Sequence, residues 1–466
     1  MSEEKSPATA LKEKLCLKQK NCRLNADDST LAKADSFCEN YKAYLNIART
    51  ERLAIREAIS LAIAKGFVEF EPGKTYNPGD KVYVNNRKKA AIFAIIGKEP
   101  VENGVNISAA HIDSPRLDLK PNPLYEDSDI ALLKTHYYGG LRKYQWTAIP
   151  LALHGVFAKT DGTVVEIAIG DEPNEPCFVI TDLLPHLAVE QSKRTLNEGV
   201  KGEELNIVIG SHPFRDDKES ELVKLNILKL LNEKYGFVES DFLSAEFECV
   251  PTFPARDVGL DCSMIGSYGH DDRVCAYPAL IGILDTENPS RTAITILADK
   301  EEVGSDGNTG LNSAFLKYFI EDLAHMQNTF GYHVLRASRC LSADVNAAFD
   351  PTFPDVMDRR NAAMLNRGVV ITKYTGSRGK GDTSDASAEY IGQIRAMLDN
   401  AKIDWQIGEL GKVDAGGGGT VAKYLANLGI DVVDLGVPVL SMHSPFEVVA
   451  KYDVYMAYLA IKEFYK

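Results

Sequence analysis

Hydrophobic and polar positions along the chain form blocks that predict helices and strands in turn. Between about residues 30 and 65, apolar side chains recur at helical spacing and the run stops at a glycine, which predicts a helix. Short apolar runs predict strands at 81–86 and 105–111. After residue 250, strand-like and helical patterns alternate again, ending in a predicted helix at 445–466. This alternation is typical of an α/β fold with a central mixed, largely parallel sheet flanked by helices.

The section from residue 121 to 249 has a different pattern. Residues 155–170, GVFAKTDGTVVEIAIG, contain two β-rich runs around an Asp-Gly pair, which is a hairpin signal. An amphipathic pattern at 219–236 predicts a helix with a glycine stop. We interpret this section as a smaller β-rich domain inserted into a discontinuous one, which comprises residues 1–120 and 250–466.

Composition narrows the class of protein. The 466 residues are 45% hydrophobic and 25% charged, as in an ordinary globular protein, and the net charge of −14 argues against a nucleic-acid surface. The N-terminus lacks the apolar core of a signal peptide, and no uncharged apolar run approaches the length of a membrane span. Eight scattered cysteines without a C-x-x-C pair predict reduced thiols, not a disulfide frame or a thiolate zinc site. We therefore expect a cytoplasmic protein without nucleic-acid or membrane partners.

Several apolar runs end on, or lead into, residues that can bind a metal. These residues are His111 with Asp113, Asp271, the pair Glu301 and Glu302, Asp344, and His443. Ligands of open α/β sheets bind beyond the carboxyl ends of the strands, so these segments are expected to converge. Each has a simpler interpretation: a packed histidine, a helix N-cap, a turn aspartate or a solvated loop. Their shared position and the mixture of imidazole and carboxylate favour a site for zinc, cobalt or manganese.

The same residues match the needs of peptide hydrolysis. Two metals about 3.5–4 Å apart can polarise a peptide carbonyl and activate water. Such a site needs a bridging carboxylate, terminal ligands and a free carboxylate that moves the proton. Asp271 can bridge, and Glu302 and Asp344 can be terminal ligands beside the two histidines. Glu301 is then the base, and Asp113 can hold the imidazole two residues before it by its other nitrogen.

The motifs HIDSP, DDR, EEVGS, SAD and MHS, in this order and spacing, resemble the aspartyl aminopeptidase family of dinuclear metallo-aminopeptidases. The resemblance extends over nearly the whole chain, including YYGGL and LLPHLA in the middle section and GGGGT near the end. It implies removal of N-terminal residues from peptides, with Asp and Glu as candidate preferences. It also implies two Zn²⁺ per chain, with Co²⁺ or Mn²⁺ as substitutes. The inserted domain would serve dimerisation, within a homo-oligomer that is commonly a dodecamer built from dimers.

The resemblance also distributes the roles within the site. It implies that His111 and Asp344 bind one metal, that Glu302 and His443 bind the other, that Asp271 bridges them, that Glu301 is the general base and that Asp113 orients a ligand. The chain departs from the eukaryotic pattern in two places. No histidine follows SAD, and Phe446 stands where relatives carry an arginine. These departures concern the acidic preference, not the metal site.

Candidate substrate-binding residues lie in two further stretches. Arg378 and Lys380 in the glycine-rich loop KYTGSRGKGDTSDAS could bind an acidic side chain, although a surface loop with scattered charge is the simpler interpretation. His186 is the nearest candidate for a histidine that, in the family, reaches a neighbouring subunit's active site, and Glu190 could equally fill that position. GGGGT lacks the Lys-Ser/Thr of a nucleotide site and predicts a close backbone approach near the active site.

Two hypotheses besides an aminopeptidase are compatible with the same features: another hydrolase and a non-enzymatic protein. A dizinc carboxypeptidase or an N-acyl-amino-acid deacylase would share the metal scaffold, and the discriminator is which end of the substrate must be free. A non-enzymatic scaffold is the third hypothesis. The full set of ligands with Glu301 argues against it.

Overall fold

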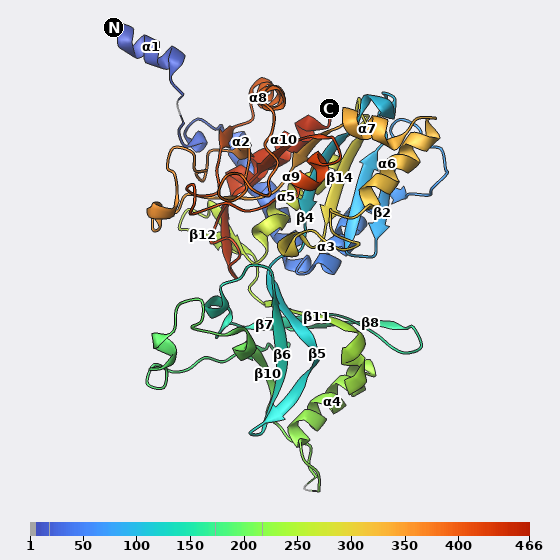
Figure 1. The fold of residues 1–466 in the computed structure, drawn as a ribbon, viewed down its shortest axis with the longest axis vertical. Coiled ribbons are helices and arrows are strands. Elements are labelled where there is room, and N and C mark those ends of the chain that lie inside the picture. The colour runs from blue at the N-terminus through green and yellow to red at the C-terminus, as the bar shows by residue number, and fades with distance from the viewer. Residues whose placement is uncertain (1–5, 18, 173, 217) are drawn as a thin grey trace.

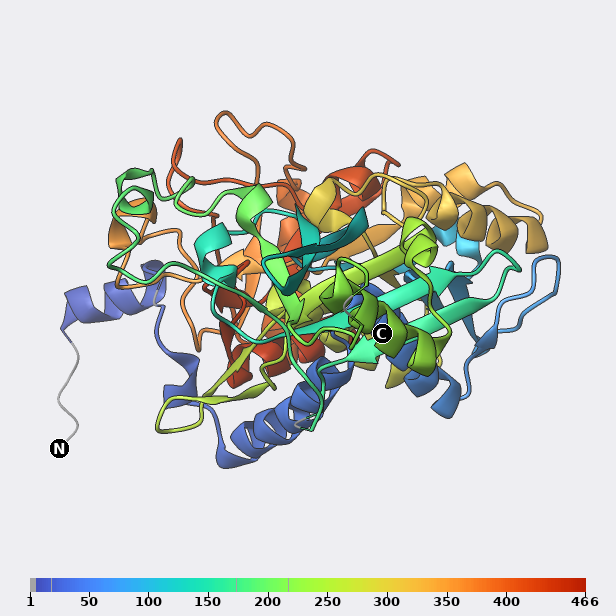
Figure 2. The same cartoon turned by 90° about the horizontal axis from the view of Figure 1, so that it is seen from below.

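The computed structural model describes residues 6–17, 19–172, 174–216 and 218–466. Two lobes stand one above the other in Figure 1, and Figure 2 shows the lower one from below. The upper, large lobe contains the beginning and the end of the described chain. We call the lower one the inserted lobe and define it as residues 116–251, the span of its sheet.

The large lobe is built on a mixed nine-stranded sheet. Its order is β1 (Val68–Glu69), β2 (Lys81–Asn86), β3 (Ala90–Ile95), β14 (Ala293–Ala298), β4 (Asn106–His111), β15 (Arg339–Ser342), β19 (Asp431–Gly436), β17 (Val369–Thr372) and β18 (Trp405–Ile407). The central strands β14, β4, β15 and β19 run parallel, whereas β3 and β17 pair antiparallel with this group. The mixed, largely parallel sheet expected from the alternating pattern is therefore confirmed.

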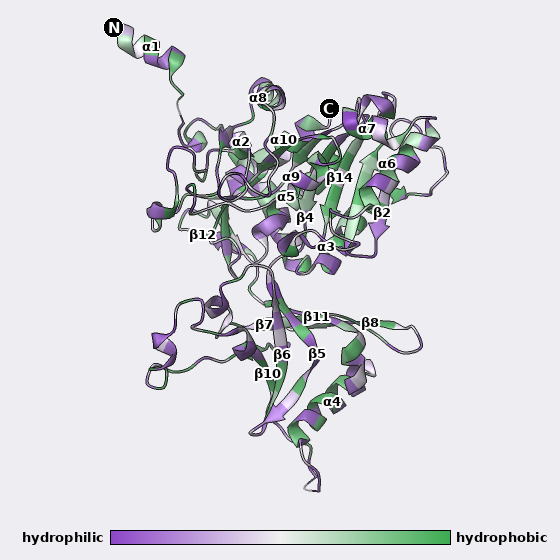
Figure 3. Cartoon of the chain, in the orientation of Figure 1, coloured by the Kyte–Doolittle hydropathy of each residue, from purple (hydrophilic) through white to green (hydrophobic). Residues whose placement is uncertain are grey.

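Helices cover both faces of this sheet. One face packs against α2 (Asp28–Ile47), α3 (Glu51–Ala64), α5 (His270–Leu284), α8 (Ala388–Ala401) and α10 (Lys451–Phe464). The other packs against α6 (Phe315–Met326), α7 (Gly331–Ala337) and α9 (Ala422–Ala426). Every residue of β3, β4 and β14 is buried, because strands covered on both faces need apolar side chains in unbroken runs. Figure 3 shows these central strands in the hydrophobic colour.

Two helical predictions are corrected by the structure. The helix expected at 30–65 is divided into α2 and α3, because Thr50 is extended and its side chain caps the amide of Leu53. The helix expected at 445–466 begins only at Lys451. Glu447–Ala450 form strand β21, which pairs with β13. Here tertiary pairing overrides the helical pattern.

The inserted lobe contains a seven-stranded antiparallel sheet and one long helix. The order is β8 (Val164–Ile169), β7 (Leu151–Ala158), β11 (Ala245–Pro251), β5 (Arg116–Asp127), β6 (Ile130–Tyr138), β10 (Asn206–Gly210) and β9 (Val179–Ile180), and the helix is α4 (Leu222–Tyr235). The hairpin predicted at 155–170 is present as β7 and β8. Strands of this sheet alternate between buried and exposed positions, as expected where one face meets solvent.

A third sheet lies beside the metal-ligand candidates in the large lobe. Its five strands are β12 (Arg256–Val258), β13 (Met264–Ser267), β21 (Glu447–Ala450), β20 (Pro438–Leu440) and β16 (Asn346–Ala347). The first helix, α1 (Pro7–Leu15), buries none of its side chains and extends away from both lobes (Figures 1 and 2). Within the described residues, no helix combines the length and the apolar character that a membrane crossing requires.

Candidate metal centre

The predicted ligands converge at one edge of the nine-stranded sheet. Strand β4 ends on His111, which pairs in parallel register with Ala298, the last residue of β14. Glu301 and Glu302 follow β14 in a single turn of 3₁₀-helix, and Asp344 follows β15. Because these three strands are parallel neighbours, their carboxyl ends present all of these side chains at the same edge.

Asp271 and His443 approach this edge from elsewhere. Asp271 lies in the first turn of α5, with a non-helical backbone, and the peptide bond to Asp272 is cis. His443 follows β20 of the five-stranded sheet. The structure therefore brings all five predicted ligands together, although they come from four different strand ends and one helix start.

Three groups of side chains could hold an ion: one joins His111, Glu301 and Glu302, and the other two share Asp271. We describe first the two that share Asp271. In the first group, His111 Nε2 lies 3.2 Å from Asp271 Oδ1 and 4.0 Å from Asp344 Oδ1. In the second, His443 Nε2 lies 3.1 Å from Asp271 Oδ2 and 3.5 Å from Glu302 Oε2. Within each group the ligand atoms lie within 4.8 Å of one another. The two oxygens of Asp271 therefore face two different imidazoles.

Burial and mutual repulsion dominate the electrostatics of the carboxyl groups. Burial raises the pKa of Glu302 and of Asp344 well above the ordinary value, and neighbouring aspartates raise both further. Burial also raises the pKa of Glu301 to about 7. The pKa of Asp271 lies below its ordinary value because the contacts with both histidines outweigh the effect of burial.

The two histidines respond in the opposite direction. Burial lowers the pKa of His443, but contact with Asp271 outweighs it and raises the pKa to about 11. Contacts with Asp113 and Asp271 likewise raise the pKa of His111 well above its ordinary value, against the effect of burial. A buried cluster of this kind needs positive charge, which either protons or metal ions can supply.

The side chains fit a zinc-type ion. The donor set contains imidazole nitrogens and carboxylate oxygens, which zinc accepts in peptidase sites. Among the described residues, Glu302 Oε1 and Asp344 Oδ2 are buried and have no hydrogen-bond partner. Unpartnered buried carboxylate oxygens are costly, and coordination to a cation would satisfy them.

Asp113 occupies the orienting position expected for it. Its Oδ1 lies 3.3 Å from His111 Nδ1, and the side chain is completely buried. The backbone amides of Glu301 and Glu302 donate to its two oxygens, each at 3.1 Å. This carboxylate therefore contacts a predicted ligand and fixes the turn that carries two more predicted site residues.

Sequence reasoning gave Glu447 no role in the metal centre, but the structure shows one. Its Oε1 accepts from the amide of His443 at 2.8 Å, and its Oε2 accepts from the amide of Asp271 at 3.1 Å. The side chain is 1% exposed and thus holds the backbone of two predicted ligands in place. A carboxylate in the apolar run FEVVA was the available signal.

A cavity of about 470 Å³ opens onto the ligands. Asp271, Glu301 and His443 form part of its wall, and the backbone of Gly417–Gly419 forms another part. A Cβ at Gly417 would lie 2.1 Å from the carbonyl oxygen of Gly376, so the predicted close backbone approach is present. The cavity is large enough for an amino-acid side chain next to the cluster.

None of the three candidate substrate-binding residues lines this cavity, although Thr375 and Asp382 of the loop that carries Arg378 and Lys380 do. Lys380 contacts Asp385 at 2.7 Å, and Lys373 contacts the same carboxylate. Arg378 is an exposed residue of this loop, and His186 is exposed in the inserted lobe. Within the described part of the chain, the residues that line the cavity include none of the three; its lysine is Lys423.

The chain is similar to known proteins in sequence and in fold. A sequence model described as "Aminopeptidase I zinc metalloprotease (M18)" matches residues 44–465. A Clostridium acetobutylicum protein, described as a probable M18 family aminopeptidase 1, is 48% identical over 444 residues, which cover 94% of this chain and 96% of that protein. The crystal structure of an M18 family aminopeptidase from Thermotoga maritima has 44% identity and a TM-score of 0.92, covering 97% of this chain and 99% of that chain. A structure titled "Structure of S. cerevesiae mApe1 dodecamer", at 20% identity and a TM-score of 0.74, covers 93% of this chain and 97% of that chain and shares the fold.

Proposed function

This chain belongs to the M18 family of aminopeptidases, and we propose that its metal centre holds two zinc ions. The family is one of zinc metalloproteases, and the chain is an exopeptidase that removes N-terminal residues from peptides. One observation carries the two-ion proposal. The two oxygens of Asp271 face Nε2 of two different histidines, as a bridging carboxylate requires.

We assign the two ligand groups to two ions. His111 and Asp344 would hold one ion, and Glu302 and His443 would hold the other, with Asp271 shared. A pair of zinc ions bound there would polarise the scissile carbonyl and lower the pKa of the attacking water, and cobalt or manganese could substitute. The protein would supply the ligands and the cavity next to them.

Glu301 is the proposed general base. Its Oε2 lies 3.9 Å from His111 Nε2, and its side chain lines the cavity, but neither group that shares Asp271 needs it. A carboxylate so placed can accept a proton from the attacking water. It can then return that proton to the amine that leaves. Asp113 positions Glu301, because its Oδ1 accepts a hydrogen bond from the backbone amide of Glu301.

An acidic substrate preference, with His186, Arg378 and Lys380 as substrate-binding residues, stays a prediction. Lys380 already contacts Asp385. A substrate carboxylate would therefore have to compete with that aspartate, or meet a loop that rearranges when peptide binds.

We further propose a homo-oligomer in which residues 121–249 form a dimerisation domain. Exposed apolar side chains gather in one irregular segment of the inserted lobe, namely Leu183, Leu184, Leu187, Val189 and Leu196, and contact with another copy would cover them. The mApe1 structure named above is a dodecamer, so a dodecamer built from dimers is the assembly that we propose here. All eight cysteines are free thiols, which supports a reducing, cytoplasmic location.

Metal reloading followed by a substrate panel tests the function. Metal-depleted protein is reloaded with zinc, cobalt or manganese, and bound metal is counted by mass spectrometry. Hydrolysis of aminoacyl-anilides is then compared with that of the same compounds N-acylated and with that of N-acylated dipeptides, whose carboxyl end is free. We expect two ions per chain and activity only on the free amine. Preference for the acylated compounds would favour a deacylase, and preference for a free carboxyl end would favour a carboxypeptidase.

A further inference from the structure

The inserted lobe reaches the metal centre of its own chain through one short segment. This segment is Tyr138–Gly140, which consists of the last residue of strand β6 and the two residues after it, and it lies against the predicted ligands. A Cβ added at Gly139 would lie 3.1 Å from Glu302 Cβ, and one at Gly140 would lie 3.3 Å from His443 Nδ1. The backbone here therefore packs directly on two of the side chains that would hold metal.

Tyr138 contacts the carboxylate that orients His111. Its hydroxyl donates to Asp113 Oδ2 at 2.7 Å. Burial raises the pKa of Tyr138 far above its ordinary value, so the phenol remains a donor. The contact of Asp113 with His111 and its hydrogen bonds from the amides of Glu301 and Glu302 come from the large lobe, whereas the hydrogen bond from Tyr138 comes from the inserted lobe.

Gly140 makes the corresponding contact with the second histidine. Its carbonyl oxygen accepts from His443 Nδ1 at 2.8 Å. A proton held on Nδ1 leaves Nε2 as the free lone pair, and Nε2 is the atom that faces Asp271 and Glu302. Both predicted histidine ligands thus have their second nitrogen held in place, one through Asp113 and one by Gly140.

Charges at the lobe junction anchor this segment. The Arg116 guanidinium lies 4.0 Å from the centre of the Tyr138 ring and is ion-paired with Glu51 and Glu248, each at 3.3 Å. Glu51 belongs to α3 of the large lobe, whereas Arg116 and Glu248 belong to strands of the inserted lobe. Tyr138 is therefore held from both lobes at once.

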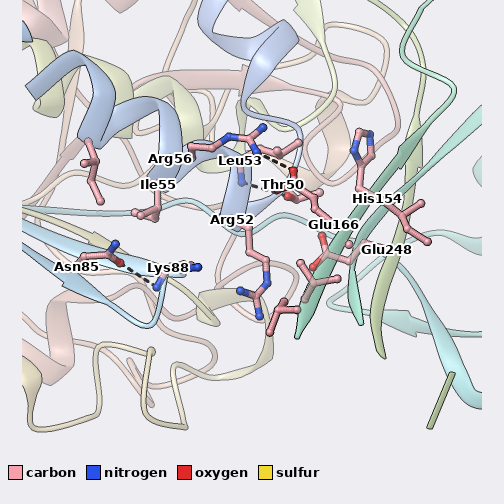
Figure 4. Close-up of a pocket in the computed structure, with 15 residues that line it drawn as sticks. Thr50, Arg52, Leu53, Ile55, Arg56, Asn85, Lys88, His154, Glu166 and Glu248 are labelled. Carbon is pink, nitrogen blue, oxygen red and sulfur yellow. Dashed lines mark hydrogen bonds and ion pairs between the residues drawn. The ribbon is translucent and has the colours of Figure 1, made fainter. Parts of the chain in front are cut away.

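A cavity of about 370 Å³ lies beside these charges, between α3 and the inserted sheet (Figure 4). Glu248 lines it, and Arg56 of α3 spans the same junction by pairing with Glu166 of β8 at 2.7 Å. In the described part of the chain the two lobes have separate apolar cores, and paired charges lie next to this cavity at their junction. Specific contacts such as those of Arg116 therefore fix the orientation of the inserted lobe relative to the large lobe.

We propose that Tyr138 and Gly140 are positioning residues that set the orientation of both histidine ligands, so that the inserted lobe is a working part of the metal centre. This inference rests on the proposed function, because it takes His111 and His443 as zinc ligands. Partners of this type in metal sites typically change metal affinity or activity by about 10–100-fold when removed.

Removal of the Tyr138 hydroxyl is the direct test. We expect Tyr138→Phe to weaken zinc binding about 10–100-fold and to lower kcat while KM stays unchanged. Tyr137→Phe is the matched control, since neighbouring residues of a strand point to opposite faces and Tyr137 is exposed. Zinc affinity is measured by chelator competition. The unfolding temperature of the zinc-free variants is recorded in parallel, so that a loss of stability is told apart from a loss of zinc affinity.

Two further variants test whether Tyr138 acts through Asp113 and whether Gly140 acts on His443. If Tyr138 acts through Asp113, Tyr138→Phe should add no further loss of zinc affinity in an Asp113→Asn background. Gly140→Ala should crowd His443 and weaken the second ion more than the first, and it tests the inference even where Tyr138→Phe folds poorly.

The outcomes separate this inference from the proposed function. Zinc affinity and kcat that are equal in Tyr138→Phe and Tyr137→Phe, together with intact binding in Gly140→Ala, would overturn the inference. Failure of the unaltered protein to bind two zinc ions would instead overturn the proposed function, whatever the variants do.

Discussion

Glu301 and Glu302 are adjacent in sequence, but their carboxylates face different histidines. Glu301 Oε2 lies 3.9 Å from His111 Nε2, and Glu302 Oε2 lies 3.5 Å from His443 Nε2. The single 3₁₀ turn that carries them directs neighbouring side chains to different parts of the cluster. We therefore expect Glu301 to be free for proton transfer and Glu302 to serve as a ligand.

Glutamine at these two positions should therefore fail in different ways. Glu301→Gln keeps the size but cannot take the proton, so kcat should fall by at least about 10²–10⁴-fold with normal metal content. Glu302→Gln should lose one ion and recover partly with excess zinc. Metal content by mass spectrometry beside kcat gives the answer. Loss of metal in Glu301→Gln with loss of turnover alone in Glu302→Gln would exchange the two roles.

Alanine at Asp271 should empty the centre, because this carboxylate belongs to both of the groups to which we assign an ion. Asp344→Ala is the comparison, since Asp344 belongs to one group and its loss should release a single ion. Equilibrium dialysis followed by metal analysis measures both. Two tightly retained ions in Asp271→Ala would rule out its bridging role.

The junction between the lobes should show a pH-dependent contribution to stability. Burial alone would raise the pKa of Glu246, but contacts with Arg52 and Lys89 outweigh it and hold the pKa at about 2. A carboxylate with a depressed pKa stabilises the fold above its unfolded pKa of about 4.3 and loses that contribution as the pH falls toward 2. Since the Glu246 side chain is half exposed, we expect it to contribute about 1 kcal/mol to the free energy of unfolding at neutral pH.

Glu246→Gln tests this contribution. The variant should unfold at lower urea concentration than the unaltered protein at pH 7, and the difference should shrink as the pH is lowered below about 4.3. Glu166→Gln is a control at the same junction. The side chains of its ion pair, Arg56 and Glu166, are 59% and 50% exposed, so the pair should contribute less to the free energy of unfolding. A difference that is constant over the whole pH range would assign Glu246 a packing role instead.

Substrate selectivity should show whether Arg378 and Lys380 or Lys423 binds an acidic side chain. If the loop binds acidic side chains, Arg378→Gln or Lys380→Gln should lower kcat/KM for aspartyl- and glutamyl-anilides about ten- to a hundred-fold relative to leucyl-anilide. Lys423→Gln is the comparison, because Lys423 lines the cavity. A selective loss in Lys423→Gln alone would assign the binding of acidic side chains to Lys423. Equal losses on all substrates would give the loop a structural role.

The oligomer should depend on the apolar segment of the inserted lobe. Leu187 is 67% exposed, and Leu187→Asp should place a charge inside the proposed contact and reduce the assembly to smaller species. Leu260, a fully exposed leucine of the large lobe, provides the control variant Leu260→Asp. Light scattering on the 51.2 kDa chain measures both. A fully active monomer of the unaltered protein would contradict the proposed assembly.

The proximity of the proposed metal ligands could be predicted from the sequence because these residues lie where local patterns change. An unbroken apolar run predicts a buried strand, and a polar residue at its end predicts the edge of the sheet. His111 and Asp344 follow directly from this rule, and the pair at Glu301 gains its meaning from the strand before it. The hairpin at 155–170 was equally local, since an Asp-Gly turn between two β-rich runs needs no distant partner.

Local patterns could not predict contacts between distant segments. Gly140 and His443 are 303 residues apart, and nothing near either residue specifies that a carbonyl meets an imidazole. Glu447 stood in a stretch with a helical pattern, but pairing with β13 made it a strand residue and directed its carboxylate at two ligand amides. The sequence by itself determined which residues can bind metal and which runs form the central sheet, because periodicity and residue chemistry are local properties. Only the tertiary structure decided which atoms face one another and that the inserted lobe supplies Tyr138 and Gly140, because those contacts arise when separate elements pack.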